Sequence, residues 1–132
     1  MKQIILVLAM AVAWAFPMEA EDSGSEPRAV IAAQFDAFQT DDLERAFSYA
    51  SEGIQRIFGT PEGFGAMVQS GYPMVWRPAE TRFLELRDAE GVSWQKVLVR
   101  DEDGIWHALD YKMEKVGSVW KIDGVQFLRR AE

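Results

Sequence analysis

TRFLELRDAEGVSWQKVLVRDEDGIWHALDYKMEKVGSVWKIDGVQFL, residues 81–128, contains four runs in which apolar and polar side chains alternate. The runs cover residues 81–88, 92–101, 105–115 and 118–128, and the short connections AEG, EDG and VG separate them. Such alternation indicates β-strands with one buried face, and strands joined by such short connections pair in antiparallel fashion. We therefore predict a four-stranded antiparallel meander in the second half of the chain.

A helical period of apolar residues precedes this predicted sheet, from Pro27 to about Ser70. Ile31, Phe35 and Phe38, for example, lie at i, i+4 and i+7. Residue types that start or close helices divide this part of the chain. In chain order they are Asp41 and Asp42, Ser51, Gly59, Thr60, Pro61 and Gly71. We predict three or four short helices, packed on one face of the sheet in an α+β domain.

The start of the chain has the composition of a signal peptide. Lys2 supplies a short basic region, and residues 4–16, IILVLAMAVAWAF, form an apolar run that suits an h-region and is short for a bilayer span. Small residues permit cleavage after Ala15 or Ala20, and we favour Ala20 because the polar stretch EDSGSEP follows. An uncleaved membrane anchor is the alternative.

Cleavage after Ala20 makes residues 1–20 the signal peptide and residues 21–132 a single α+β domain. We expect this domain to be periplasmic or secreted in a bacterium, with no stable membrane span after cleavage. The chain has no cysteine, so neither disulfides nor a thiolate site can form. The core alone must stabilise the exported protein.

Charge and residue types exclude further classes of function. The net charge is -7, and it stays at that value without residues 1–20 because Lys2 and Glu19 cancel. This negative balance repels polyanions, so we expect no nucleic-acid partner. One histidine, no cysteine and scattered carboxylates do not form a transition-metal shell, and DEDG, residues 101–104, is more typical of a turn than of a calcium loop. We expect no metal and no cofactor.

The third predicted strand carries the residues of most chemical interest. Because side chains alternate along a strand, we expect Leu109, Tyr111 and Met113 to face the helices, with His107 on the same side. A histidine titrates near neutrality and could act as an acid or base. The simpler interpretation is a histidine at the end of a strand that bonds a backbone group or water.

The run QFDAFQTDDLERAFSYASEGIQRIFGTPEGFGAMVQSGYPMVWRP, residues 34–78, resembles a bacterial family described only as domain of unknown function 4864. The matching positions are Gln34, Phe38, Asp41, Asp42, Ala46, Phe47, Ala50, Ser51, Ile54, Gln55, Phe58, Gly59, Phe64, Met67, Val68, Gly71, Tyr72, Pro73, Arg77 and Pro78. In the sheet half, Asp103, Gly104, Tyr111, Met113 and WKIDG at residues 120–124 also fit. The resemblance covers almost the whole chain after residue 20. Met74 and Trp76 depart from the pattern, which more often has proline and tyrosine there.

The resemblance implies a fold but no activity, because none is assigned to the family. The expected fold is similar to the cystatin-like class, which includes nuclear transport factor 2-like and ketosteroid isomerase-like proteins. Such folds wrap a curved sheet around a long helix and leave a conical pocket. Some of these proteins are enzymes and many only bind or dimerise, so the fold does not give the function.

The segment MVQSGYPMVWRP, residues 67–78, must connect the helices to the first strand, and its prolines favour extended geometry in the residues before them. In one interpretation it is a rigid crossover in which Tyr72 and Trp76 cap the core and Arg77 pairs with an acid. In the other it is a lid at the pocket mouth, where Tyr72 and Trp76 hold an apolar ligand and Arg77 binds a carboxylate or phosphate. With Tyr111, these three are the candidate ligand-binding residues.

Two hypotheses of function follow. The first is a non-catalytic exported module that holds a small apolar or anionic ligand or docks an envelope protein. Tryptophans on successive strands, Trp94, Trp106 and Trp120, could pair across strands, form a ligand wall or support a homodimer through the sheet. The alternative is a small isomerase or lyase in which Asp110 is the base and Tyr72 or Tyr111 is the hydrogen-bond donor, which requires them to share one cavity.

Overall fold

The computed structural model of the chain describes residues 26–90 and 92–128. The predicted signal peptide and both predicted cleavage sites lie outside these residues. Within the described residues, five helices precede four strands, which confirms the predicted α+β class. The helices are α1 (Pro27–Gln39), α2 (Leu43–Ser48), α3 (Glu52–Phe58), α4 (Pro61–Gly71) and α5 (Pro73–Trp76), and the strands are β1 (Glu80–Ala89), β2 (Val92–Arg100), β3 (Trp106–Val116) and β4 (Val119–Phe127).

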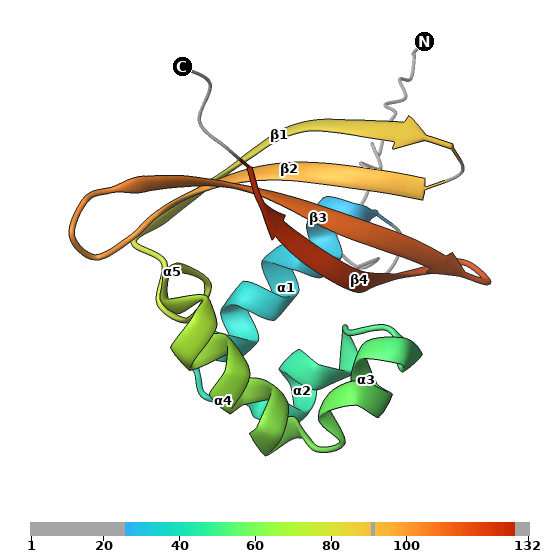
Figure 1. Cartoon of the computed structure of the whole chain (residues 1–132), viewed down its shortest axis with the longest axis horizontal. Coiled ribbons are helices and arrows are strands. Elements are labelled where there is room, and N and C mark those ends of the chain that lie inside the picture. The colour runs from blue at the N-terminus through green and yellow to red at the C-terminus, as the bar shows by residue number, and fades with distance from the viewer. Residues whose placement is uncertain (1–25, 91, 129–132) are drawn as a thin grey trace, which may run out of the picture.

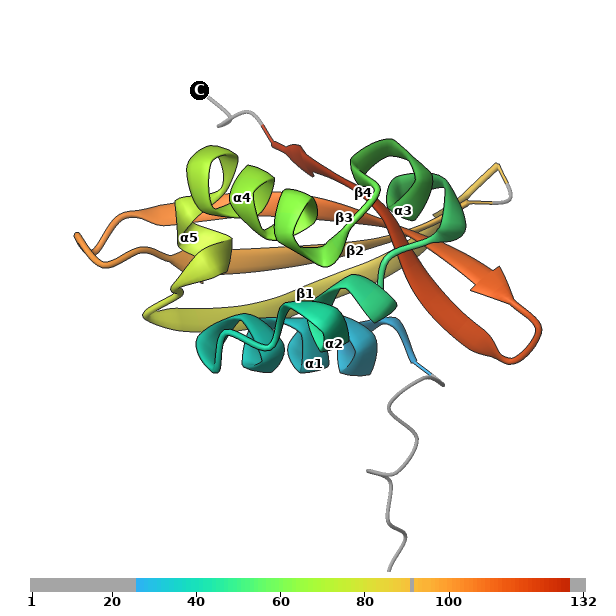
Figure 2. The same ribbon diagram turned by 90° about the horizontal axis from the view of Figure 1, so that it is seen from below.

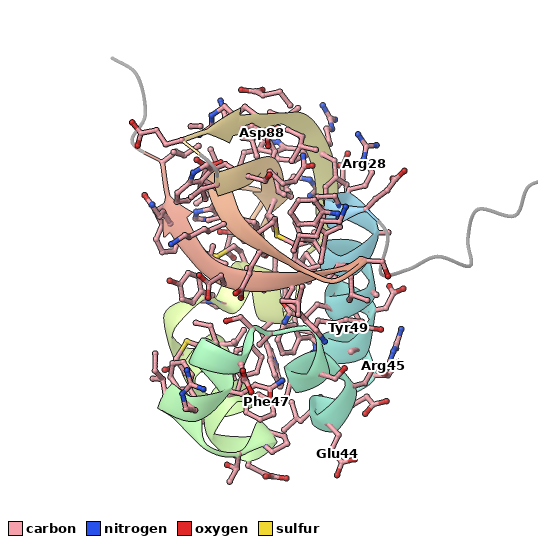
Figure 3. The ribbon with its side chains drawn as sticks, turned by 90° about the vertical axis from the view of Figure 1, so that its right-hand side faces the viewer. Arg28, Glu44, Arg45, Phe47, Tyr49 and Asp88 are labelled. Carbon is pink, nitrogen blue, oxygen red and sulfur yellow. The ribbon has the colours of Figure 1, made fainter. Side chains whose placement is uncertain are left out.

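The strands form one antiparallel sheet in the order β1-β2-β3-β4, so the predicted meander is confirmed. Every strand begins and ends within one residue of the predicted run. The helices all lie on the same side of the sheet (Figure 1), and the view from below places α1 and α2 beside α4 and α5 (Figure 2). Figure 3 shows the two layers from the side, with Asp88 on the sheet and Glu44 at the far end on α2.

Side-chain caps start three of the short helices. The side chains of Asp42, Ser51 and Thr60 accept hydrogen bonds from backbone N–H groups three residues later, at the first turns of α2, α3 and α4. The capping roles predicted for Ser51 and Thr60 are thus confirmed, and Gly59 closes α3 with a φ of 78°. Asp41, in contrast, does not cap α2; its φ is 59° and it belongs to the turn after α1.

The fifth helix is a correction to the expected three or four. Pro73 stands in the first turn of α5, where its missing N–H costs nothing. The residues before the two prolines, Tyr72 and Arg77, do leave helical geometry, with φ values of −136° and −140°. The crossover therefore contains a compact helical turn between two residues that are neither helical nor fully extended.

Each edge strand contains a β-bulge. In β1 the register shifts between Phe83 and Leu86, and the buried Gln95 amide on β2 donates to the Leu84 carbonyl at 2.9 Å. In β4 the register shifts beside Lys112 of β3 and leaves Asp123 as the extra residue. These bulges bend the edges of the sheet locally. The Leu84 carbonyl in the first bulge and the Asp123 carboxylate in the second both accept side-chain hydrogen bonds.

The bulge in β4 is also the point where the helices attach to the sheet. The Ser51 hydroxyl donates to Asp123 Oδ1 at 2.6 Å, and the Ser51 backbone N–H donates to the Ile122 carbonyl at 2.8 Å. Ile122 in turn donates to the Tyr49 carbonyl at 2.9 Å, next to a parallel bridge between Ala50 and Ile122. The junction of α2 and α3 is therefore bonded directly to the end of the meander.

The core lies between the sheet and the helices. Leu109, Tyr111 and Met113 are buried on the helix side of β3, as predicted. They meet apolar residues of α1, α4 and α5. The buried apolar residues are Val30, Ile31, Phe35, Ala37, Phe38, Ala46, Ala50, Phe64, Val68, Met74, Val75, Val97, Val99, Leu109, Tyr111, Met113 and Ile122.

Candidate functional site

A cavity of about 260 Å³ lies between the helices and the last two strands. Its wall combines side chains from α1, α3, α4, α5, β3 and β4. The lining residues are Gln34, Ala50, Ile54, Phe58, Phe64, Met67, Val68, Tyr72, Val75, Tyr111, Ile122, Gly124 and Val125. Most are apolar, and several are only half-buried, so the cavity reaches the surface. This volume is just below the range of about 300–1,000 Å³ that is usual for small-molecule sites.

Two rings of an aromatic cluster, Phe58 and Phe64, line the cavity, and Phe38 and Phe47 pack against Phe64. The Phe64 ring lies 5.4 Å from the Phe47 ring and 6.0 Å from each of the Phe38 and Phe58 rings. Phe47 lies on α2 and Phe58 on α3, two short helices whose first turns are capped by Asp42 and Ser51. The amide of Gln34, a polar residue in this wall, donates to the Ala46 carbonyl at 3.1 Å. Gln34 is thus a polar side chain in an otherwise mostly apolar lining, and its amide already has a hydrogen-bond partner.

Tyr111 supplies the most unusual polar group of the cavity. The side chain is fully buried, and its ring meets the edge of Phe35 at 6.3 Å between centroids. Among the described residues, its hydroxyl is the buried side-chain oxygen or nitrogen without a hydrogen-bond partner. Burial, and then the neighbouring Tyr72 phenol, raise the pKa of Tyr111 far above its usual value. The phenol therefore stays neutral and is able to donate a hydrogen bond.

Tyr72 lies at the rim of the same cavity, between α4 and α5. Its ring stacks on Phe127 with the two planes 6° apart and the centroids 5.2 Å apart. Its hydroxyl donates to the Val125 carbonyl over 3.4 Å, a long hydrogen bond. Of the four candidate ligand-binding residues, Tyr72 and Tyr111 are the two that line this cavity.

Trp76 and Arg77, the other two candidates, lie outside the cavity wall. The Arg77 guanidinium donates to the Phe38 carbonyl at 2.6 Å, to the Trp76 carbonyl at 2.9 Å and to Asp41 at 2.8 Å. It also lies 4.9 Å from the Trp76 ring, which in turn contacts the ring of Phe38. These contacts match the rigid-crossover interpretation, in which Arg77 pairs with an acid.

The open side of Arg77 does not suit an anion. Arg77 borders a shallow hollow of about 210 Å³ together with Asp101, Glu102 and Asp103. Those carboxylates would repel a bound carboxylate or phosphate. The ligand-binding role of Arg77 stays a prediction, and this geometry gives it no support.

Asp110 does not meet the geometry that the enzymatic alternative requires. Its side chain is 5% exposed and accepts two hydrogen bonds from Arg87, at 3.2 and 2.5 Å. It alternates with Tyr111 along β3, so it lies on the face of the sheet away from the helices. Among the residues described, the lining of the cavity contains no carboxylate. The pairing of Asp110 with Tyr72 or Tyr111 in one cavity is therefore wrong.

The tryptophans of the sheet do not pair with each other in the described part of the chain. Trp106 instead contacts two cations, Arg100 on the neighbouring strand β2 at 5.8 Å and Arg82 on β1 at 4.8 Å from the ring centre. Lys115 lies 5.6 Å from the ring of Trp120. The expectation of cross-strand aromatic pairs is wrong in this part of the chain, where cations from other strands lie against the rings of Trp106 and Trp120.

His107 contacts a carboxylate at the start of β3. Its Nε2 lies 2.8 Å from Asp101 Oδ2, while Asp101 Oδ1 accepts the backbone N–H groups of Asp103 and Ile105 at 2.9 Å each. Gly104 follows with a φ of 86°. DEDG is therefore a turn, as predicted, and the partner of His107 is a side chain instead of the predicted backbone group or water.

The Asp101 turn predicts a pH dependence of stability. The hydrogen bond with His107, followed by that from the Ile105 N–H, lowers the pKa of Asp101 below its ordinary 3.8. A lowered folded-state pKa stabilises the protein above the unfolded-state pKa, and this stabilisation disappears as the pH falls through the folded-state pKa. We expect Asp101→Asn to lower the free energy of unfolding at pH 7. Below about pH 4, the free energy of unfolding should decrease less steeply in this variant than in the wild type.

Chemical unfolding at several pH values between 2 and 7 measures this effect. Asp103→Asn removes the same charge from the same turn and controls for net charge. Identical pH profiles for the wild type and Asp101→Asn would contradict the proposed origin of the acid dependence.

The described residues contain neither a cluster of metal-binding side chains nor a helix suited to a membrane. No group of three or more His, Cys, Asp or Glu side chains there is arranged to hold a metal ion. Likewise, within residues 26–90 and 92–128 no helix has the length and apolar character that crossing a membrane requires.

Comparison with known proteins places the chain in a family. The family described as Domain of unknown function (DUF4864) matches residues 20–132. The chain belongs to this family. No curated protein and no solved structure matches the DUF4864 chain significantly.

Several residues of the DUF4864 pattern have clear structural roles here. Ser51 and Asp123 bond the helices to the β4 bulge. The Gln55 amide donates to the Phe47 carbonyl at 2.9 Å and to the Ala50 carbonyl at 3.1 Å, which satisfies the end of α2. These polar residues therefore hold one side of the cavity in place without lining it.

Other cavity residues carried no signal in the sequence as functional residues. Ile54, Phe58, Phe64 and Met67 fit the family pattern and the predicted helical half, and nothing in the sequence distinguishes them as ligand-binding residues. In the sequence, an apolar helix residue that lines a cavity follows the same periodic pattern as one that fills the core. Only the arrangement of the helices against β4 distinguishes the two.

Proposed function

We propose that this protein is an exported, non-catalytic module that binds a small, predominantly apolar ligand in the cavity between the helices and the last two strands. The observation that carries the proposal is a fully buried tyrosine hydroxyl without a partner in the wall of an apolar cavity. Buried polar groups in folded proteins are nearly always hydrogen-bonded. A ligand that accepts this hydrogen bond would satisfy Tyr111.

The surroundings of the cavity favour binding over catalysis. The polar side chains in the described wall are Gln34, Tyr72 and Tyr111, and two of them already donate to backbone carbonyls. No described lining residue is a carboxylate or histidine that could move a proton. In this proposal Tyr111 anchors the ligand, Tyr72 shields the rim, and Trp76 with Arg77 holds α5 in place.

Export is the second part of the proposal. It rests on the basic residue Lys2, on the apolar run at residues 4–16 and on the small residues at the two cleavage sites. We also propose that the domain is similar to the cystatin-like and nuclear transport factor 2-like class. The antiparallel meander, with α1 and the other helices on one face and a cavity between the layers, supports this relation.

Native mass spectrometry tests both parts on protein purified from the envelope of its own host. The denatured mass should correspond to a chain that begins at Glu21. The native mass should exceed it by a small molecule that is lost on denaturation. A chain that keeps residues 1–20 would refute export with cleavage. A clean apo mass would instead support docking of a partner protein, and an integer multiple would reveal a homodimer.

A matched pair of variants on α4 connects the bound mass to the cavity. Met67 lines the cavity, and its neighbour Ala66 is exposed and outside it. We expect Met67→Trp to fill the cavity and to abolish the excess mass, and Ala66→Trp to retain it. Equal retention in both variants would mean that the ligand binds elsewhere.

A further inference from the structure

The chemistry of the cavity wall restricts the ligand further than its volume does. Among the residues that the structure describes, none that lines the cavity carries a charge at neutral pH. The nearest candidate for an anion, Arg77, is bonded to Phe38, Trp76 and Asp41 instead. A carboxylate or phosphate in this cavity would lose its hydration without gaining a cation. The site therefore selects against anions.

One polar group of the wall has no partner, and it is a hydroxyl that can donate a hydrogen bond. Tyr111 is fully buried, its ring is fixed against Phe35, and its hydroxyl has no partner. The phenol is neutral and has one hydrogen bond left to donate, and Tyr111 is part of the cavity lining. An acceptor oxygen on the ligand is the complement of this group.

We propose that the cavity binds a small neutral molecule with an apolar body and one carbonyl-type oxygen, which accepts a hydrogen bond from the Tyr111 hydroxyl. This inference rests on the proposed function of the same cavity. It narrows the expected apolar or anionic ligand to neutral ketones, aldehydes, esters or amides. Tyr72 at the rim, which already donates to the Val125 carbonyl, covers the apolar body.

Three matched probes test the inference by NMR titration of the purified protein. Cyclohexanone carries the acceptor, methylenecyclohexane has the same shape without an oxygen, and cyclohexanecarboxylate carries a negative charge. Each is titrated into the wild type, Tyr111→Phe and Tyr49→Phe. Tyr49 is a matched control because its hydroxyl accepts a hydrogen bond from Arg45 outside the cavity.

We expect Tyr111→Phe to weaken cyclohexanone binding about tenfold and to leave methylenecyclohexane binding unchanged, since one hydrogen bond is lost in the first case only. Tyr49→Phe should change neither affinity, and the carboxylate should bind more weakly than the ketone. The Tyr111→Phe protein should fold, because the hydroxyl has no partner in the structure to lose.

The outcomes separate the two proposals. If both neutral probes bind and Tyr111→Phe affects them equally, the inference fails and the cavity remains a binding site. Tighter binding of the carboxylate than of the ketone would also overturn the inference. If no probe shifts the resonances of the cavity residues in the wild type, the proposed function and the inference both fail.

Discussion

Replacing Phe38 with alanine is expected to lower the free energy of unfolding by about 3–5 kcal/mol, the range for buried aromatic side chains. Phe38 is fully buried, and its ring lies 5.4 Å from Trp76 and 6.0 Å from Phe64. One side chain thus fills the space between α1, α4 and α5. Folded domains are stable by only about 5–15 kcal/mol, so this single change would remove a large part of the total.

Urea denaturation followed by circular dichroism measures this loss. Phe38→Leu should cost less, because it leaves a smaller cavity. Ile57→Ala is the surface control, since Ile57 is 71% exposed, and we expect a change within about 0.5 kcal/mol. Equal losses for Phe38→Ala and Ile57→Ala would contradict the packing described for the helices.

Replacing Arg77 with methionine is expected to lower the free energy of unfolding by about 1.5–3 kcal/mol, the range for hydrogen bonds to charged groups. Methionine retains much of the apolar stem but cannot donate to the carbonyls of Phe38 and Trp76 or to Asp41. The change therefore removes the link between the end of α1 and the end of α5. Chemical unfolding of the variant and the wild type measures the difference.

The control for this variant is another arginine on a helix. Arg56 lies 4.0 Å from Glu52 with both side chains largely exposed, so Arg56→Met should cost at most about 1 kcal/mol. If Arg77→Met left stability unchanged but weakened a bound anion, Arg77 would belong to a ligand site, as one interpretation of the sequence held. A loss of stability alone would assign it to the crossover.

The sheet was more predictable from the sequence than the helical half. Alternating side chains and short glycine-containing connections define each strand within one residue. Ser51 and Thr60 likewise identify helix starts through their capping chemistry. The four-residue helix α5 was missed because it is too short for a helical period to appear. The bulges were missed because Gln95 and Asp123 look like ordinary polar residues of a strand.

The candidate site was only partly predictable. Tyr72 and Tyr111 were selected from the sequence and do line one cavity, whereas Trp76 and Arg77 pack beside it. The sequence places these residues close together along the crossover but does not say which way α5 turns each side chain. The pairing of Asp110 with Tyr72 or Tyr111 was a hypothesis that required one shared cavity, and Asp110 is instead bonded to Arg87. Adjacent residues of a strand point to opposite faces, and this geometry separates them.

The two bulges lie in β1 and β4, the strands at the open edges of the meander. An edge strand with a regular row of free N–H and C=O groups is a template on which another chain can add a strand and begin to aggregate. Here each edge row is interrupted, at Leu84 and Glu85 in β1 and at Asp123 in β4. The same irregularities that fix Gln95 and Ser51 thus make both edges poor templates for intermolecular β-sheet, and the net charge of -7 adds repulsion between copies.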